Sequence, residues 1–543
     1  MILLLVASVG AVAQTTFERV YDGPGNGQDT ALKLIQTLDG GFALVGYTNG
    51  LNWADHYIVK TDGDGIFEWD RMWGDSQSAE YFRDVDQTLP DSNFVFAGGT
   101  AWQANVDGFT TWTGSDLIND LAFTSVEAIE PTSDGGYITC GYGYSISQSN
   151  NLQATLVKRN AAGDTLWTSV LGLSSIQDVA TDVVQRADGG YTFIGSKDGQ
   201  VTLTRTSAAG VEISTAYYPS ADLESPYDYP IRGPFSLSQT ADGGYVFIAK
   251  KTGVNKMVVV KTDLTGSIDW TYDLGENDSA PFGGVKQTSN GGYIAVAGNR
   301  VSWDTQTRPY MVRLNSAGQF QWDRRFTSGI TGQFSDVVEC TDGGFAACGT
   351  LRLSDNGPQD DFYLVKVNSS GNSPNPACFT AVAYTQNNLT CGAEIQYLGT
   401  GNSVEDWYYY INSENVSNQP QGTATLEPGI YGLSLTTVSP DGCVSSDEDS
   451  VFVNGPFWVD AGADILACQQ PAQLMTQVTP PNNYTYQWTP AISQLSNPNI
   501  AGPIVSGGVD HVDFTVTVTD PNGCSVSDVV NVTQQSWLNT TYD

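Results

Sequence analysis

The chain has 543 residues, and its 23 lysine and arginine residues against 59 aspartate and glutamate residues give a formal net charge of −36. Such acidity argues against nucleic acid and anionic membrane surfaces as partners, because both are held by clustered basic side chains. Only His56 and His511 are present, which excludes a histidine-rich zinc site and leaves little room for Ser-His-Asp catalysis. At roughly 100–200 residues per domain, the length predicts about three or four folded domains.

The N-terminus carries an apolar run from Ile2 to Val12 that ends in Ala11-Val12-Ala13. This pattern is typical of a secretory signal peptide with its cleavage site after Ala13. The run is too short for a membrane-spanning helix, which needs about 20 apolar residues. We therefore expect residues 1–13 to be removed, and the mature protein to be secreted without membrane insertion.

An Asp-Gly-Gly motif followed by Phe or Tyr recurs through the first two thirds of the chain. Seven copies, some of them altered, begin at Asp39, Asp91, Asp134, Asp188, Asp242, Asn290 and Asp342. Asp-Gly between alternating apolar runs is a strong signal for a β-hairpin turn in which both turn residues take positive φ. Each copy is therefore expected to join two antiparallel strands.

A second hairpin follows within each unit. It consists of a β-rich stretch, a turn ending in Gly and a strand with Trp, as in residues 57–69, 155–167, 258–270 and 310–322. Four-stranded units that repeat four to eight times are typical of a β-propeller. The chain is therefore predicted to be all-β, with a seven-bladed β-propeller over residues 14–374.

The two ends of the repeat complement each other. The seventh unit lacks a Trp-bearing strand after residues 362–367, whereas a spare strand, residues 17–21, precedes the first unit. Pairing these strands would close the ring and remove two exposed sheet edges. The short turns then lie on one side and the irregular connections on the other, where loops on a rigid scaffold commonly bind ligands.

Two shorter units, residues 375–454 and 455–535, follow the repeat. Each has alternating strands with a tryptophan in mid-domain, Trp407 and Trp488, and carries a Pro-Asp-Gly-Cys or Pro-Asn-Gly-Cys turn before its last strand. Alternating strands with turns every 8–12 residues favour β-sandwiches. We therefore expect two sandwich domains.

The cysteines divide between these regions. One disulfide is expected within each sandwich, Cys391–Cys443 and Cys468–Cys524, and each should stabilise its domain by about 4 kcal/mol in the chain-entropy model. The cysteines without an evident partner are Cys140, Cys340, Cys348 and Cys378. In the propeller, buried free thiols are the simpler interpretation.

The chain resembles a group of bacterial surface proteins. Its Asp-Gly-Gly units are similar to repeats of secreted proteins from Bacteroidota-type bacteria. Residues 459–462 (Val-Asp-Ala-Gly), 486–488 (Tyr-Gln-Trp) and 517–524 (Thr-Val-Thr-Asp-Pro-Asn-Gly-Cys) resemble PKD-like, immunoglobulin-type domains of gliding-motility-associated and adhesin-like proteins. The resemblance implies Ig-like or PKD-like sandwiches, export, often by type IX secretion, and a role outside the cell or on its surface. That system's usual sorting domain is missing, so residues 536–543 are expected to be a tail or a truncated linker.

Three tryptophans are candidate ligand-binding residues. Trp53, Trp102 and Trp303 fall in corresponding loops between the second and third strands of three units. Exposed indole rings would offer flat apolar surfaces on which sugar rings or protein side chains can stack. The alternative is that they pack the loops against the propeller rim.

Carboxylates give a second set of candidates. Asp84, Asp182 and Asp336 align near the start of the first strand of their units, where they could ring the channel mouth and bind a cation, or else cap turns. Calcium is also considered at residues 62–65, Asp-Gly-Asp-Gly, which resemble the start of a calcium loop. The equivalent turns of other units lack the second carboxylate, which favours an ordinary turn, and no other cofactor is expected.

These observations predict a non-enzymatic binding or adhesion protein. The propeller would present a face to an extracellular glycan or protein ligand, on a stalk of two sandwiches. One alternative is a propeller glycoside hydrolase or polysaccharide lyase that uses carboxylates at the channel mouth. Another is a structural subunit of an extracellular filament, with surface or filament partners.

Overall fold

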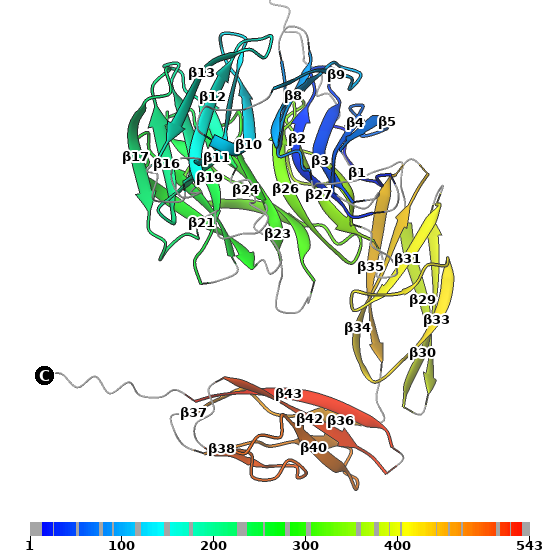
Figure 1. Ribbon diagram of the computed structural model, residues 1–543. Coiled ribbons are helices and arrows are strands. Elements are labelled where there is room, and N and C mark those ends of the chain that lie inside the picture. Colours follow the sequence, from blue (N-terminus) through cyan, green and yellow to red (C-terminus); the bar gives the residue numbers. More distant parts are fainter. Residues whose placement is uncertain are drawn as a thin grey trace, which may run out of the picture.

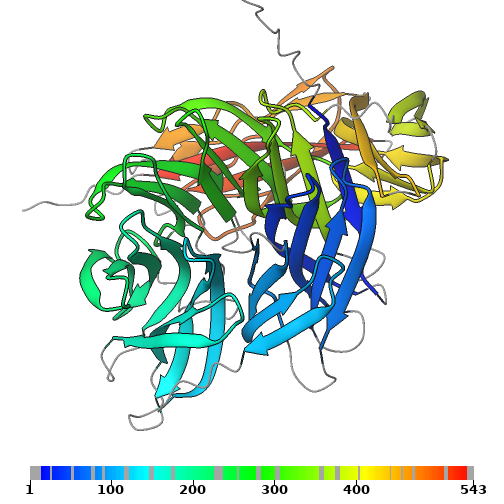
Figure 2. The same ribbon diagram turned by 90° about the horizontal axis from the view of Figure 1, so that it is seen from above.

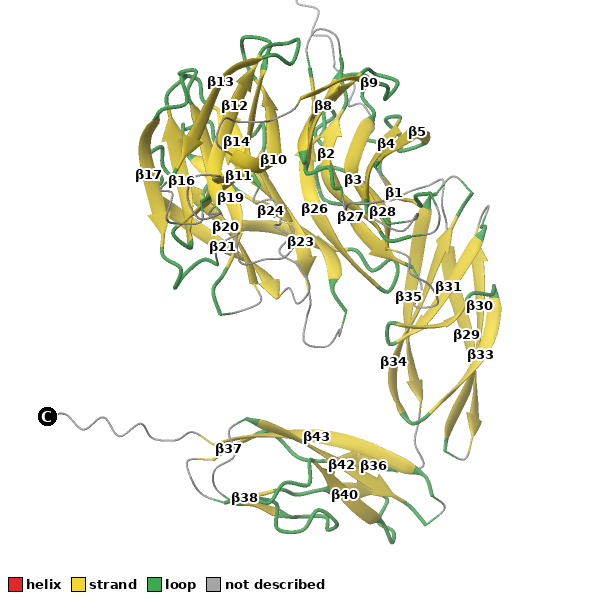
Figure 3. Cartoon of the chain, in the orientation of Figure 1, coloured by secondary structure: helices red, strands yellow, loops and turns green. Residues whose placement is uncertain are grey.

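The computed structural model describes residues 14–534 except for 25–26, 50–53, 75–79, 89–91, 115–120, 146–151, 173–177, 225–235, 254–255, 277–282, 300–305, 354–359, 374–379, 390, 402–403, 441, 454–456, 468–470, 507–510 and 522. The expected signal peptide and tail lie outside this part. The described residues form strands and turns without an α-helix, as Figure 3 shows. Accordingly, no helix among them is long and apolar enough to cross a membrane.

Between residues 17 and 367 the described strands form seven four-stranded antiparallel sheets (Figure 1). The first sheet contains β2 (Asp29–Gln36), β3 (Phe42–Thr48), β4 (Asp55–Thr61) and β5 (Phe67–Trp73). The second contains β6 (Asp84–Gln87), β7 (Phe94–Gly98), β8 (Thr100–Ala104) and β9 (Thr110–Gly114). The third contains β10 (Leu121–Pro131), β11 (Tyr137–Ser145), β12 (Leu152–Arg159) and β13 (Thr165–Leu171). The fourth contains β14 (Val179–Gln185), β15 (Tyr191–Lys197), β16 (Gln200–Thr206) and β17 (Glu212–Tyr218). The fifth contains β18 (Leu237–Gln239), β19 (Tyr245–Lys250), β20 (Lys256–Thr262) and β21 (Ile268–Glu276). The sixth contains β22 (Gly283–Gln287), β23 (Tyr293–Asn299), β24 (Arg308–Leu314) and β25 (Phe320–Arg325). The seventh contains β26 (Thr331–Glu339), β27 (Phe345–Arg352), β28 (Asp360–Val367) and β1 (Phe17–Tyr21).

The seventh sheet joins the two ends of the repeat. β1 pairs with β28, with Phe17 opposite Lys366 and Tyr21 opposite Phe362, which is the pairing predicted from the two leftover strands. The first strand of each sheet contacts the first strand of the next, from β2 through β6, β10, β14, β18, β22 and β26 back to β2. Figure 2 shows the sheets side by side around a common centre. Burial of apolar side chains between successive sheets forms most of the core.

The Asp-Gly-Gly turns are three-residue hairpin loops. Gly40 takes a φ of 89°, whereas Asp39 is not among the described residues with positive φ. Thr37 N donates to Gly41 O at 2.9 Å, and Gly40 N donates to Thr37 O at 2.8 Å. The expectation of two consecutive residues at positive φ is therefore wrong, because the Asp39 carboxylate accepts a hydrogen bond from Gly41 N at 3.0 Å and stabilises a longer loop.

A tryptophan–glycine contact links successive sheets at their outer strands. The tryptophan in the fourth strand of one sheet packs against the glycine in the last turn of the next sheet. The pairs are Trp69 with Gly108, Trp112 with Gly163, Trp167 with Gly210, Trp270 with Gly318 and Trp322 with Gly371. Phe17 of β1 takes the same place against Gly65. The contact therefore continues across the junction of the first and seventh sheets, and it explains the recurring spacing of Gly and Trp.

A glutamine or glutamate at the end of the first strand links the same sheets at another point. Its side chain accepts a hydrogen bond from the Asp-Gly-Gly turn of the preceding sheet, as Gln87 does from Leu38 N at 2.8 Å. Gln36 accepts in the same way from Thr341 N at 2.8 Å, which joins the first sheet to the seventh.

Residues 380–453 form two facing sheets. One contains β29 (Thr380–Leu389), β30 (Gly392–Gly401) and β33 (Gln421–Leu426), and the other contains β32 (Glu414–Ser417), β31 (Asp406–Ile411), β34 (Gly429–Val438) and β35 (Val444–Val453). Their side chains share one core, in which the rings of Tyr397 and Tyr409 have centroids 4.4 Å apart.

Residues 458–534 form a second small unit around Trp488, which is fully buried. Its strands are β36 (Trp458–Asp460) with β39 (Gln477–Thr479), β38 (Ala472–Gln473) with β41 (Ile504–Val505), and a sheet of β37 (Ile465–Ala467), β43 (Ser525–Gln534), β42 (Val512–Thr519) and β40 (Thr485–Thr489). In this last sheet β37 runs parallel to β43.

The cysteine pairing differs from the expected one. Cys391 bonds to Cys524, so the disulfide joins the two small units, and both expected pairings, Cys391–Cys443 and Cys468–Cys524, are wrong. The reason is that Cys391 lies between β29 and β30 and packs against the core around Trp488. Cys443 is also disulfide-bonded.

The remaining cysteines fall into two groups, those outside the described residues and those in the seven four-stranded sheets and their turns. Cys378 and Cys468 lie outside the described residues. Cys140, Cys340 and Cys348 are buried free thiols, as the sequence indicated.

The first small unit docks on the seventh sheet (Figure 1). Val20 N of β1 donates to Gly442 O at 3.0 Å, and Tyr410 OH donates to Leu353 O at 2.6 Å. Val438 and Val444 belong to the same buried cluster as core residues of the seventh sheet. This unit is therefore held by a shared apolar core as well as by hydrogen bonds.

Candidate functional site

The three aspartates singled out in the sequence converge on one lysine. Lys33 Nζ lies 3.9 Å from Asp84 Oδ1 and 3.8 Å from Asp182 Oδ2. Asp336 has the strongest electrostatic effect on Lys33 of the three, and all four side chains are buried. The first strands of four sheets thus place one ammonium group among three carboxylates.

Each aspartate also binds the backbone of the next sheet. Asp84 Oδ2 accepts from Ile129 N at 3.0 Å, Asp182 Oδ2 from Leu237 N at 2.8 Å, and Asp336 Oδ2 from Leu34 N at 3.3 Å. These bonds do not cap turns within one unit. They connect neighbouring first strands, which gives the three aspartates a structural role in addition to any binding role.

Lys33 and the three aspartates line a cavity of about 300 Å³ at the first strands of the sheets, and further charged groups share its wall. Asp86, Glu130 and Lys286 join Lys33 and the three aspartates in its wall. Burial raises the pKa of Asp84 to about 7, that of Asp86 to about 6 and that of Glu130 to about 8. Burial also acts to lower the pKa of Lys33, but the three aspartates outweigh it and raise that pKa, so Lys33 stays protonated.

Of the three candidate tryptophans, Trp53 and Trp303 lie outside the described residues. Trp102 lies within β8 rather than in a loop, because a tight turn with Gly99 at a φ of 64° joins β7 to β8. Its half-buried indole packs against the first two sheets, with ring centroids 5.5 Å from His56 and 6.3 Å from Phe82.

The Asp-Gly-Asp-Gly segment forms a hydrogen-bonded turn. Asp62 Oδ1 accepts from Asp64 N at 2.9 Å and from Ile66 N at 2.8 Å. Asn160 holds the corresponding turn of the third sheet in the same way, from Ala162 N at 3.0 Å and Asp164 N at 2.9 Å. Because an amide serves as well as a carboxylate, these contacts are those of an ordinary turn.

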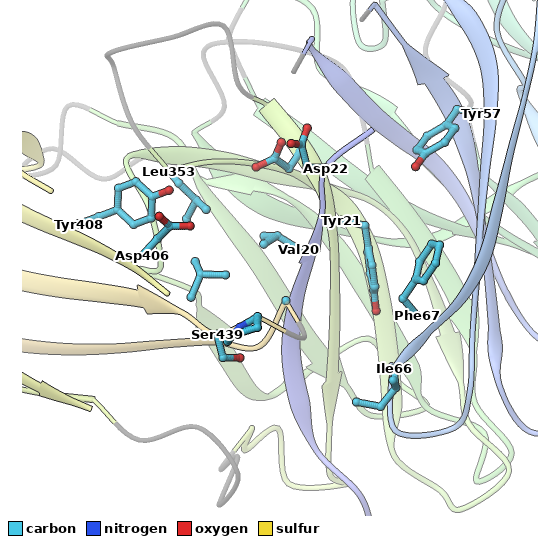
Figure 4. Close-up of a pocket in the computed structure, with 14 residues that line it drawn as sticks. Val20, Tyr21, Asp22, Tyr57, Ile66, Phe67, Leu353, Asp406, Tyr408 and Ser439 are labelled. Atoms are coloured by element: carbon cyan, nitrogen blue, oxygen red, sulfur yellow. The ribbon is translucent and has the colours of Figure 1, made fainter. Parts of the chain in front are cut away.

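A larger cavity of about 630 Å³ lies between the seventh sheet and the first small unit. Figure 4 shows Tyr408 and Asp406 on one side, Tyr21, Tyr57 and Phe67 on the other, and Val20 between them. Tyr21 OH donates to Gly65 O at 2.6 Å and Tyr57 OH to Asp70 Oδ2 at 2.8 Å. Since these hydroxyls already have partners, the two rings contribute mainly apolar surface to the cavity.

The sequence did not indicate this second cavity, because its walls come from β1, from the first and seventh sheets and from the small unit that follows them. It combines aromatic surfaces with the carboxylates of Asp22, Asp361 and Asp406. Pockets that bind small molecules typically combine apolar walls with a few polar groups.

No family model matches the chain, and no curated protein is similar to it. Among solved structures, BBS1N, crystallised in complex with ARL6DN, is 10% identical over 66% of this chain and 100% of its own, with a TM-score of 0.40. A glucose dehydrogenase is 8% identical over 52% of this chain and 95% of its own, with a TM-score of 0.33. A luciferin-regenerating enzyme is 9% identical over 64% and 95%, with a TM-score of 0.33.

Proposed function

We propose that the chain is a non-enzymatic binding or adhesion protein, secreted or exposed on a bacterial cell surface. In this proposal the seven sheets are the blades of one closed β-propeller, and the two small units are Ig-like or PKD-like sandwiches. The closed succession of contacts from β2 back to β2 and the pairing of β1 with β28 support this reading of the fold.

The proposed ligand is an extracellular glycan or protein that binds in the cavity between the seventh sheet and the first small unit. The observation that carries this proposal is the lining of that cavity, in which Tyr408 and the carboxylate of Asp406 lie on one side and Phe67 lies on the other. Sugar rings and apolar side chains stack on aromatic faces, and a carboxylate accepts hydrogen bonds from hydroxyl and amide groups.

A glycan array followed by calorimetry on the full chain tests the site. Phe67→Ala and Tyr408→Ala should each weaken binding by at least about tenfold, since aromatic anchors commonly contribute more than about 1.4 kcal/mol. Phe320→Ala is the matched control. Phe320 begins β25 as Phe67 begins β5 and is similarly exposed, 53% against 48%, but it does not line the cavity.

The same experiment separates the alternatives. Cleavage of a bound glycan would contradict the non-enzymatic proposal, and ordered self-assembly without any ligand would favour a filament subunit. Loss of binding in Trp53→Ala and Trp303→Ala, with Phe67→Ala unaffected, would instead place the ligand on the side where the sequence predicts the irregular connections.

A further inference from the structure

Three aspartates from different elements meet beside the large cavity. Asp22 follows β1, Asp29 begins β2 and Asp361 lies in β28, and one carboxylate oxygen of each lies within 4.8 Å of the other two. The pairing of β1 with β28 causes this meeting, because Tyr21 lies opposite Phe362 and brings the next residue, Asp22, beside Asp361.

Two of these carboxylates are buried with an oxygen that has no hydrogen-bond partner. Asp361 is 7% exposed and Asp29 is 0% exposed, and Oδ1 of each lacks a donor. Oδ2 of Asp29 accepts from Gly23 N at 2.5 Å. A buried carboxylate oxygen without a partner is unfavourable. Burial accordingly raises the pKa of Asp29 to about 6 and that of Asp361 to about 8.

The basic side chain opposite Asp360, the residue before Asp361, is already engaged. Arg352 donates to both oxygens of Asp360, from Nε at 2.7 Å and from Nη2 at 3.0 Å. Among the ion pairs of the described residues, none involves Asp22, Asp29 or Asp361. The three carboxylates therefore form an acidic site without a protein counterion in this part of the chain.

We propose that Asp22, Asp29 and Asp361 bind a calcium ion. Calcium takes oxygen ligands at about 2.3–2.6 Å, so two oxygens on one ion can be up to about 5 Å apart, and the three carboxylates satisfy this limit. Asp22 and Asp361 also line the large cavity, where waters can complete a shell of about six to eight oxygens. The proposal does not depend on the organic ligand suggested above.

Calcium titration of the full chain, after dialysis against EDTA, tests the site. Calorimetry should detect binding, with Kd in the range of about 0.1–1 mM that is common for extracellular modules. The melting temperature should rise and saturate over the same range, because a ligand that binds only the folded state stabilises it. Magnesium should produce a smaller rise, since it favours shorter bonds and keeps its waters.

Substitutions assign the effect to these residues. Asp361→Asn should abolish the calcium-dependent rise. At pH 7 in EDTA it should melt higher than the wild type, because Asp361 must take up a proton when it is buried, since its pKa is raised to about 8, whereas Asn is already neutral. Asp22→Asn, at an exposed position, keeps the test valid if Asp361→Asn does not fold. Asp406→Asn is the control, since Asp406 lines the same cavity outside the cluster.

Two results would overturn the proposal. One is a wild-type protein whose melting temperature and heat of titration do not respond to millimolar calcium. The other is a full calcium response in both Asp22→Asn and Asp361→Asn. A magnesium response at least as large as the calcium response would overturn the choice of metal. All these measurements omit glycans and proteins, so they remain interpretable if the proposed ligand function fails.

Discussion

At the scale of single residues, the acidic groups have different structural roles, which depend on the cation or hydrogen-bond donor that each one contacts. Lys60 is 3% exposed, and its Nζ lies 3.0 Å from the turn carboxylate of Asp39. Lys158 and Lys261 approach Asp134 and Asp242 in the same way, each at 2.9 Å. Much of the negative charge in the repeat therefore stabilises turns, whereas the central aspartates surround Lys33.

Replacing Lys33 should destabilise the protein strongly. In Lys33→Met, Asp84, Asp182 and Asp336 lose their ammonium partner while staying buried, and breaking a buried charge cluster in this way costs about 3–5 kcal/mol. Denaturant unfolding measures the loss. Lys251→Met is the control, because Lys251 is exposed and lies 3.5 Å from the exposed Asp273, and such a pair contributes about 0–1 kcal/mol. Equal effects of the two substitutions would contradict a structural role for Lys33.

The central carboxylates should also make stability depend on pH. The folded state raises the pKa of Asp86 to about 6, of Asp84 to about 7 and of Glu130 to about 8, whereas in the unfolded chain these groups titrate near pH 4. The folded state therefore binds more protons between pH 4 and 8, and its stability should fall as the pH rises through that window. Lys33, Lys286, Asp182 and Asp336 share the cavity with them.

The turn aspartates act in the opposite direction at lower pH. Asp134 and Asp242 have their pKa lowered to about 2; although burial would raise it, hydrogen bonds from Thr132 and Thr240 and from the lysines outweigh burial. Their contribution to the free energy of unfolding is present above pH 4 and is lost as the pH falls toward 2. Melting temperatures in EDTA should thus be highest near pH 4–5, and a maximum at pH 8 would contradict this assignment.

At the scale of elements, the outer strands are joined by the tryptophan–glycine contact. Gly318 takes a φ of 74°, and a Cβ built there would lie 2.5 Å from the Trp270 ring. The glycine is therefore required twice, by its backbone conformation and by the approach of the neighbouring sheet. A fourth strand that carries Trp can pack only if the next unit supplies a residue without a side chain.

Gly318→Ala should lower the free energy of unfolding by about 2–4 kcal/mol, the sum of positive-φ strain and overpacking. Gly291→Ala separates the two contributions. Gly291 has a φ of 83° with nothing within 4 Å of an added Cβ, so its substitution should produce only the strain, about 1 kcal/mol. If both variants unfold at the same denaturant concentration, the packing of Trp270 contributes nothing.

At the scale of the whole molecule, the disulfide between Cys391 and Cys524 joins the two small units, and the first of these shares a core with the seventh sheet. The chain is therefore connected more closely than three domains on simple linkers would be. The cavity that carries the proposed function exists only because the first small unit docks along β1.

Peptide mapping without reduction should recover the fragments of Cys391 and Cys524 as one cross-linked species. Cys524→Ser should leave the melting of the seven four-stranded sheets unchanged while the last unit becomes more sensitive to protease, because the bond constrains a separation of 133 residues. Recovery of Cys391 with Cys443, the pairing expected from the sequence, would contradict the connection between the two units.

The sequence was sufficient to predict the elements that depend on local chemistry: the positions of the turns, the four-strand period and the edge strand that pairs with β28. It also singled out Asp84, Asp182 and Asp336, because the repeat places them at one position. Lys33 stands six residues before Asp39, as Asp182 does before Asp188, and that alignment could have revealed it. Three features could not be predicted in this way: the partner of Cys391, the cavity along β1 and the meeting of Asp22 with Asp361. Each depends on which distant surfaces pack together in the folded chain, and neither residue spacing nor turn chemistry encodes that choice.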